Sequence, residues 1–126
     1  MKKRRNLPRA RGLRREAGVM NKTEKAYSEH LEALKGAGAI AEYWFEPFNL
    51  RLAPKCYYKP DFLVQDADGY LEVHEVKGFF EPDAIVRVKT AAEKFPFKFV
   101  VIKKKKKKEG GGWAFRYFGG QDVRDE

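Results

Sequence analysis

The stretch YYKPDFLVQDADGYLEVHEVKG, residues 57–78, decides which fold the chain can adopt. Two segments rich in apolar and β-branched residues, 61–65 and 70–77, predict strands. The intervening residues 66–69, Asp-Ala-Asp-Gly, are of types that favour a tight turn. The stretch therefore predicts a β-hairpin, although its second strand contains charged residues.

The charges of this hairpin are predicted to converge on one face. Side chains alternate across a strand, so Glu75 and Lys77 share a face while His74 and Val76 point to the other. If the hairpin is centred on Asp68, Asp61 and Glu75 are each seven residues from its centre. The two carboxylates then lie directly opposite each other, with Cβ atoms roughly 5 Å apart.

Two carboxylates this close need a cation. At about 4 Å they repel by roughly 4 kcal/mol at an effective dielectric constant near 20, and one lysine offsets only part of that. All-oxygen ligands suit Mg²⁺, with Mn²⁺ as a substitute. Such an ion lowers the pKa of a bound water and neutralises a phosphodiester under attack, so the pattern predicts metal-dependent phosphodiester hydrolysis.

The rest of the chain predicts one α/β domain over residues 21–126. Apolar periodicity predicts a helix over 22–35 and a second helix from Pro82 to Pro96. Strands are expected around 41–52, as one or two strands, and at 97–102 and 113–118. The expected order is α-β-β-β-α-β-β, a mixed sheet flanked by helices, in which 97–102 is a buried parallel strand after a crossover helix.

Positive charge is concentrated at the two ends of the chain. The net charge is +9, and residues 1–20 carry eight basic residues against one acidic residue, which predicts a disordered basic arm. Residues 103–126 carry eight basic and four acidic residues. Such blocks indicate nucleic acid or an anionic membrane as partner, and a solubilising tail is an equally good interpretation of either block alone.

Cysteine and histidine content excludes other classes. A single Cys56 allows no internal disulfide, and two histidines, His30 and His74, cannot build a zinc cluster. The basic start lacks the apolar run of a signal peptide, and no stretch is long and apolar enough to span a membrane. These features predict a soluble protein of a reducing compartment.

Several candidate residues have structural alternatives. Residues 21–24, Asn-Lys-Thr-Glu, fit a helix-capping box, yet Glu24 also heads the apolar face of the first helix. His74 is expected to be packed or hydrogen-bonded on the far face with Glu72. The 66–69 turn is not a calcium loop, because Lys77 stands where a bidentate Glu is required. The lysine run 103–108 is either a solvated hairpin end or part of a DNA path.

These residues together resemble the PD-(D/E)xK nuclease superfamily. The matching residues are Glu24, an aromatic strand over 43–48, the Tyr58-x-Pro-Asp-Phe segment, the Glu75-x-Lys-Gly segment and a basic helix over 82–94. The stretch from 21 to about 102 is similar to small phage and prophage proteins of that superfamily and to Holliday junction resolvases of the bacteriophage endonuclease I type. The resemblance implies a restriction-endonuclease-like core and, as the location, the cytoplasm of a bacterium or of a phage-infected host.

The resemblance also implies roles for individual residues. Asp61 and Glu75 would bind metal with the backbone carbonyl of Val76, Lys77 would be the catalytic lysine, and Glu24 would complete the acidic cluster. The predicted function is a Mg²⁺-dependent DNA endonuclease acting on branched recombination or replication intermediates, possible as a homodimer. The alternatives are a non-catalytic DNA-binding or recombination accessory protein and an RNA-binding basic protein.

The predicted nucleic-acid contacts are basic residues of three segments, the arm, the second helix and the lysine run. They are Lys2, Lys3, Arg4, Arg5, Arg9, Arg11, Arg14, Arg15, Arg87, Lys89, Lys94, Lys103, Lys104, Lys105, Lys106, Lys107 and Lys108.

Overall fold

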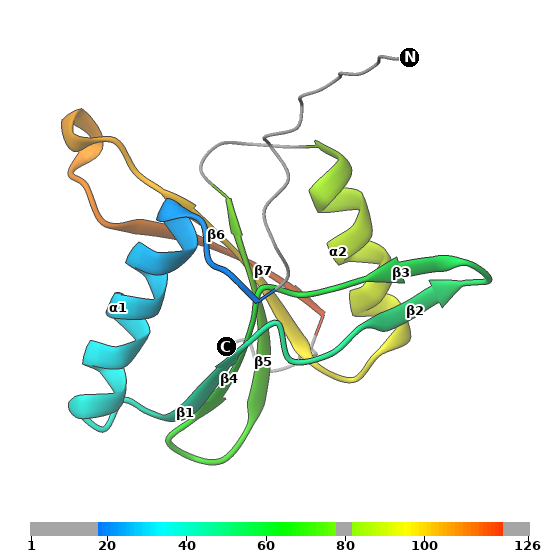
Figure 1. The fold of residues 1–126 in the computed structure, drawn as a ribbon, viewed down its shortest axis with the longest axis horizontal. Coiled ribbons are helices and arrows are strands. Elements are labelled where there is room, and N and C mark those ends of the chain that lie inside the picture. The colour runs from blue at the N-terminus through cyan, green and yellow to red at the C-terminus, as the bar shows by residue number, and fades with distance from the viewer. Residues whose placement is uncertain (1–17, 78–81, 120–126) are drawn as a thin grey trace, which may run out of the picture.

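The computed structural model describes residues 18–77 and 82–119, which form an α/β fold with a mixed five-stranded sheet and two α-helices. Figure 1 shows the arrangement of these elements. In chain order they are α1 (Lys22–Gly36), β1 (Ile40–Phe45), β2 (Leu50–Ala53), β3 (Cys56–Tyr58), β4 (Phe62–Asp66), β5 (Leu71–Lys77), α2 (Pro82–Lys94), β6 (Lys98–Lys104), the 3₁₀ turn η3 (Lys107–Glu109) and β7 (Trp113–Gly119).

The sheet has the strand order β1-β4-β5-β6-β7, with β5 at its centre. Strands β4 and β5 form the expected antiparallel hairpin, and β5 pairs with β6 in parallel after the crossover through α2. The central position of β5 explains why residues 73–76 are buried, because a central strand is covered on both faces of the sheet. The predicted hairpin and the predicted parallel strand are therefore confirmed.

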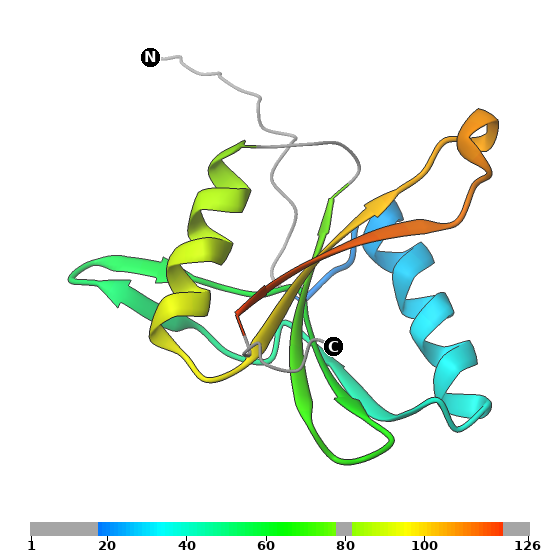
Figure 2. The same ribbon diagram turned by 180° about the vertical axis from the view of Figure 1, so that it is seen from behind.

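The two faces of the sheet carry separate apolar cores. Helix α1 covers one face, where Tyr27 and Leu31 pack with Phe62, Val76 and Ile102. On the other face, α2 and the separate β2–β3 hairpin cover an apolar cluster, as the two views of Figures 1 and 2 show. The buried members of that cluster are Leu50, Leu52, Tyr58, Val73, Val88, Ala91, Phe99 and Val101.

The predicted element order is wrong between α1 and the β4–β5 hairpin. That segment holds three strands, β1 to β3, so the observed order is α-β-β-β-β-β-α-β-β. The chain turns away from the sheet after β1, where Glu46 has a φ of 48°. It then reverses at Pro54 and Lys55, where Lys55 has a φ of 61°. A positive φ at the second central residue defines a type II turn, for which Gly or Asn is the usual signal.

The structure describes only the last three residues of the predicted basic arm. Of the predicted basic arm, residues 1–17 lie outside the described residues. Residues 18–20 lie against the domain: the Gly18 N–H donates to Glu46 Oε1 at 2.9 Å, and Met20 packs against the α1-side core. No helix within the described residues is long and apolar enough to cross a membrane.

Candidate active site

The β4–β5 hairpin brings Asp61 and Glu75 together as the turn chemistry predicted. Phe62 pairs with His74, which confirms the register that places Asp61 opposite Glu75. The turn is held by Asp66, whose Oδ1 accepts hydrogen bonds from the N–H groups of residues 68 and 70. Asp61 stands just before β4, after the fully buried Pro60, and both carboxylates are buried, with 7% and 5% of their surfaces exposed.

Each carboxylate of this pair accepts hydrogen bonds from a defined donor. Asp61 Oδ2 accepts the Val76 N–H at 2.8 Å. Glu75 Oε1 accepts the Tyr58 hydroxyl at 2.7 Å, and Glu75 Oε2 lies 3.0 Å from Lys77 Nζ. Glu75 is therefore held by a phenol on one oxygen and an ammonium on the other, which fixes where its remaining lone pairs point.

The pair carries more negative charge than its surroundings neutralise. Burial raises the pKa of Asp61, the nearby Glu75 carboxylate raises it further, and the value reaches about 8 despite the opposing hydrogen bond from Val76. Without a bound cation, Asp61 therefore holds a proton at neutral pH in preference to a second negative charge. A carboxyl with so perturbed a pKa, beside a second buried carboxylate, is characteristic of functional sites.

Glu24 caps helix α1 and also lies beside Asp61. The capping box is present: Asn21 Oδ1 accepts the Glu24 N–H at 2.8 Å, and Glu24 Oε1 accepts the Asn21 N–H at 3.0 Å. The Glu24 side chain also hydrogen-bonds to Asp61, which contributes to the raised pKa of that carboxyl. Helix α1 thus begins with a buried carboxylate, 3% exposed, next to the Asp61–Glu75 pair.

His74 and Glu72 form a separate network on the opposite face of β5. The Tyr27 hydroxyl lies 2.7 Å from His74 Nδ1, and His74 Nε2 lies 3.0 Å from Glu72 Oε1. Lys98 Nζ approaches Glu72 Oε2 at 3.9 Å. The hydrogen bond from His74 lowers the pKa of Glu72. The prediction that His74 is hydrogen-bonded on the far face is therefore confirmed.

The predicted basic residues flank the carboxylates on two sides. Arg87, Lys89 and Lys94 are exposed on α2, as expected. The lysine run spans the end of β6 and η3, at the tip of the β6–β7 hairpin, and five of its residues are exposed with Lys105 half-buried. In Figures 1 and 2 this tip and α2 lie on opposite sides of β5. The basic residues of the arm lie outside the described residues.

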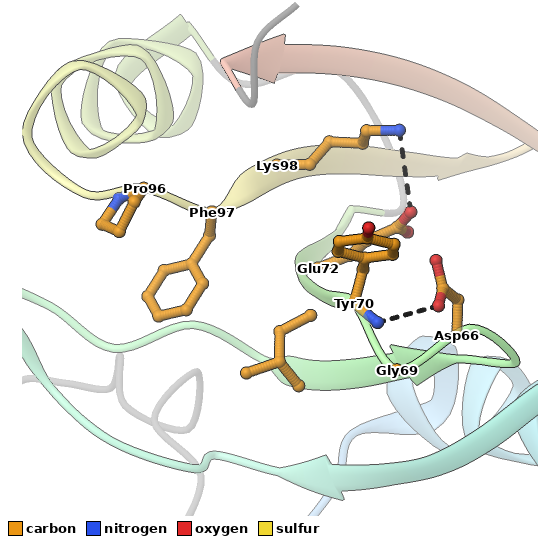
Figure 3. Close-up of a pocket in the computed structure, with 8 residues that line it drawn as sticks. Asp66, Gly69, Tyr70, Glu72, Pro96, Phe97 and Lys98 are labelled. Carbon is orange, nitrogen blue, oxygen red and sulfur yellow. Dashed lines mark hydrogen bonds and ion pairs between the residues drawn. The ribbon is translucent and has the colours of Figure 1, made fainter. Parts of the chain in front are cut away.

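A surface hollow lies at the other end of β5 and is distinct from this site. It has a volume of about 360 Å³ and is lined by residues of the 66–72 turn region and by Pro96, Phe97 and Lys98. Figure 3 shows Glu72 and Lys98 facing each other across it. The hollow adjoins the Glu72 network and contains neither Asp61 nor Glu75.

The sequence did not predict that Tyr58 acts on the carboxylate pair or that Arg87 acts on Tyr58. Tyr58 was noted only as part of a motif, but its hydroxyl holds Glu75, and its own pKa is raised by burial and then by that carboxylate. Arg87 was placed on an exposed surface, yet its charge acts on the Tyr58 hydroxyl. The spacing of three residues between Tyr58 and Asp61 was the available signal, because it joins β3 to β4 over a very short connection.

Neither the comparisons with known proteins nor the arrangement of potential metal ligands identifies the function of this site. No protein-family model, curated protein or solved structure matches the chain. Within residues 18–77 and 82–119, no group of three or more His, Cys, Asp or Glu side chains is arranged to enclose a metal ion. A cation at this site would therefore rest on two carboxylates, backbone oxygen and water.

Proposed function

We propose that the chain is a divalent-cation-dependent DNA endonuclease of the PD-(D/E)xK type. The observation that supports this most is the buried Asp61–Glu75 pair, in which burial and like charge hold a proton on Asp61. A structural ion pair would balance its charges, as the Glu72 network does. A cation that bound there would replace the proton on Asp61 and balance the charge of both carboxylates.

The residues present fit Mg²⁺ held by few protein ligands. Mg²⁺ commonly keeps several waters and uses one or two carboxylates together with substrate phosphate oxygens. Asp61 and Glu75 would supply the carboxylates. Because a strand residue directs its N–H and C=O to the same edge, the Val76 N–H bond to Asp61 puts the Val76 carbonyl on that edge also, beyond the last β4–β5 pair. Mn²⁺ has the same preference for oxygen ligands.

The side chains around the pair have separable tasks in hydrolysis. A bound Mg²⁺ supplies Lewis-acid neutralisation of the phosphate and a more acidic water. Lys77, which is 20% exposed at its side chain, can reach from Glu75 to a phosphate oxygen or an attacking water. Tyr58 keeps Glu75 in a single orientation. The exposed basic side chains on α2 and on the β6–β7 tip would hold the DNA backbone on either side of the carboxylates.

Cleavage assays test the proposal directly. Labelled four-way junction, flap and linear duplex would be incubated with the protein in Mg²⁺, in Mn²⁺ and in EDTA. Nicking that requires the divalent ion and favours the branched substrates supports both the activity and the substrate class, which the resemblance alone suggests. Equal cleavage of all three substrates would retain the nuclease and remove the branch preference.

The second candidate is a non-catalytic DNA-binding or recombination accessory protein. It is favoured by one observation, the absence from the described residues of a three-ligand metal group. DNA binding without cleavage of any substrate in Mg²⁺ or Mn²⁺ would establish it in place of the nuclease.

A further inference from the structure

The strand β7 carries a row of aromatic side chains on the α1 side of the sheet. Trp113, Phe115 and Tyr117 follow one another at every second position, so they project from the same face with about 6.8 Å between neighbours. Trp113 is partly covered, since its ring lies 5.1 Å from the ring of Tyr27. Phe115 is 44% exposed and Tyr117 is 59% exposed. The row therefore begins in the core and continues into solvent.

The covering layers explain why this part of the sheet is open. Helix α1 lies against β1 and β5, whereas α2 packs on the opposite face against β6 and β7. On the α2 side, Phe118 packs in the core, and Arg116 stacks on it with 5.0 Å from its guanidinium carbon to the ring centroid. Among residues 18–77 and 82–119, no such layer lies over Phe115 and Tyr117 on the other face of β7, where both side chains are exposed.

Lysines lie on the same face at both ends of this row. Lys104 pairs with Trp113 in the β6–β7 register, and the exposed lysine run continues from it. At the other end, Lys98 Nζ lies 5.5 Å from the centroid of the Tyr117 ring. Exposed aromatic faces interleaved with ammonium groups are the elements that bind unpaired nucleotides, because bases stack on the rings and phosphates approach the charges.

We propose that the exposed face of β7 is a stacking platform for single-stranded nucleic acid, with Phe115 and Tyr117 each receiving one base. Lys104 lies where it would neutralise a phosphate at one end of the bound segment, and Lys98, which also approaches Glu72 Oε2 at 3.9 Å, lies at the other end. A duplex cannot use the platform, because its base faces are covered by neighbouring base pairs. The platform lies on the opposite face of the sheet from Glu75, and the proposal is independent of cleavage.

Binding in EDTA tests the platform apart from any nuclease activity. The probes are a fluorescein-labelled oligo(dT) of about 16 nucleotides, the upper end of single-strand site sizes, and a mixed-sequence duplex of equal length. Anisotropy titrations compare wild type with Phe115→Leu and Tyr117→Leu, which keep apolar bulk and remove the ring. Each should weaken oligo(dT) binding by about 5- to 100-fold and leave duplex binding unchanged. Tyr117→Phe should bind oligo(dT) as the wild type does.

Matched controls separate stacking from other effects. Tyr57 on β3 is 57% exposed, away from the platform, so Tyr57→Leu should not change oligo(dT) affinity. Lys104→Gln should reduce the slope of log affinity against log salt by about 0.7 for a single strand. Sedimentation of each variant reports whether the row joins two copies of the chain.

Four results would overturn the proposal. Wild-type oligo(dT) affinity in both leucine variants excludes base stacking. An equal loss for Tyr57→Leu, or an equal loss on duplex, shows a non-specific effect. Conversion of a dimer to a monomer by Phe115→Leu or Tyr117→Leu, with oligo(dT) affinity retained, assigns the row to self-association.

Discussion

The two faces of β5 carry charged networks of similar composition and opposite balance. On the α1 face, Glu72 meets His74 and Lys98, and the Tyr27 hydroxyl completes the set. On the α2 face, Glu75 meets Lys77 and the Tyr58 hydroxyl, but a second carboxylate, Asp61, stands opposite it. Each network thus contains a tyrosine, a carboxylate and a base.

The additional carboxylate changes the chemistry of the second network. The pKa of Glu72 is lowered because a hydrogen bond from His74 favours its charged form. The pKa of Asp61 is raised because burial and Glu75 both disfavour its charge. The proposed site is therefore distinguished from the Glu72 network by unbalanced charge and not by burial alone, because a bound cation would restore the balance.

The largest expected effect is the loss of cleavage when the unbalanced carboxylates are neutralised. Asp61→Asn and Glu75→Gln should each slow Mg²⁺-dependent cleavage by more than ~100-fold. Mutation of a residue that only hydrogen-bonds to a metal ligand already lowers metal affinity or activity by about 10- to 100-fold. Glu72→Gln, on the balanced face, should cut normally. Cleavage of a labelled junction measures all three, and a normal rate for Asp61→Asn would sink the metal-site assignment.

The two tyrosines allow a matched test of the second effect. Tyr58→Phe removes the donor to Glu75 and should slow cleavage by about 10- to 100-fold with little loss of DNA binding. Tyr27→Phe removes the hydroxyl that hydrogen-bonds with His74 Nδ1 and should lower the free energy of unfolding by about 1 kcal/mol without changing the cleavage rate. Rates and urea denaturation of both variants decide this, and equal rates for the two would contradict it.

Glu24 should give a smaller, separable effect. Glu24→Gln keeps an oxygen that can accept the Asn21 N–H while removing the charge beside Asp61, so cleavage should fall about tenfold. Asn21→Ala removes the cap acceptor instead and should cost about 1 kcal/mol of stability. If Glu24→Gln lowers the melting temperature and leaves the rate intact, Glu24 acts only as a capping residue.

The pH dependence of stability should have opposite signs for the two networks. Asp61 has a folded pKa of about 8 against an unfolded value of 3.8, so its contribution weakens as pH rises between these values. Glu72 has a lowered folded pKa, so its contribution is present above the unfolded value and is lost in acid. Urea denaturation in EDTA at about pH 5 and about pH 8 should show a smaller decrease in Asp61→Asn than in wild type.

The hairpin and its register were predictable because their determinants are local. Asp66 and Gly69 encode the turn, and the turn sets which residue opposes which over the next seven positions on either side. The first helix could be predicted equally well, from the capping residue Asn21 and from the apolar face of the helix. Local chemistry therefore predicted the part of the fold that positions Asp61, Glu75 and Lys77.

The β2–β3 hairpin and the position of Tyr58 could not be predicted in the same way. The turn at Pro54 and Lys55 lacks the Gly or Asn that normally signals a positive φ. The bond from Tyr58 to Glu75 joins a small separate sheet to the central strand, so it depends on packing between layers. The exposure of the aromatic row on β7 could not be predicted for a related reason, because it depends on which part of the sheet α1 covers.

The short-range pairing of β4 with β5 also bears on the order in which the molecule folds. A hairpin with a tight turn closes in about 1–10 μs, whereas the parallel β5–β6 pair must wait for the whole α2 crossover to be placed. Asp61, directly before β4, and Glu75, on β5, belong to the two segments that meet first. We therefore expect their mutual repulsion to oppose the earliest contacts of the sheet, so that divalent ions or mild acid accelerate refolding.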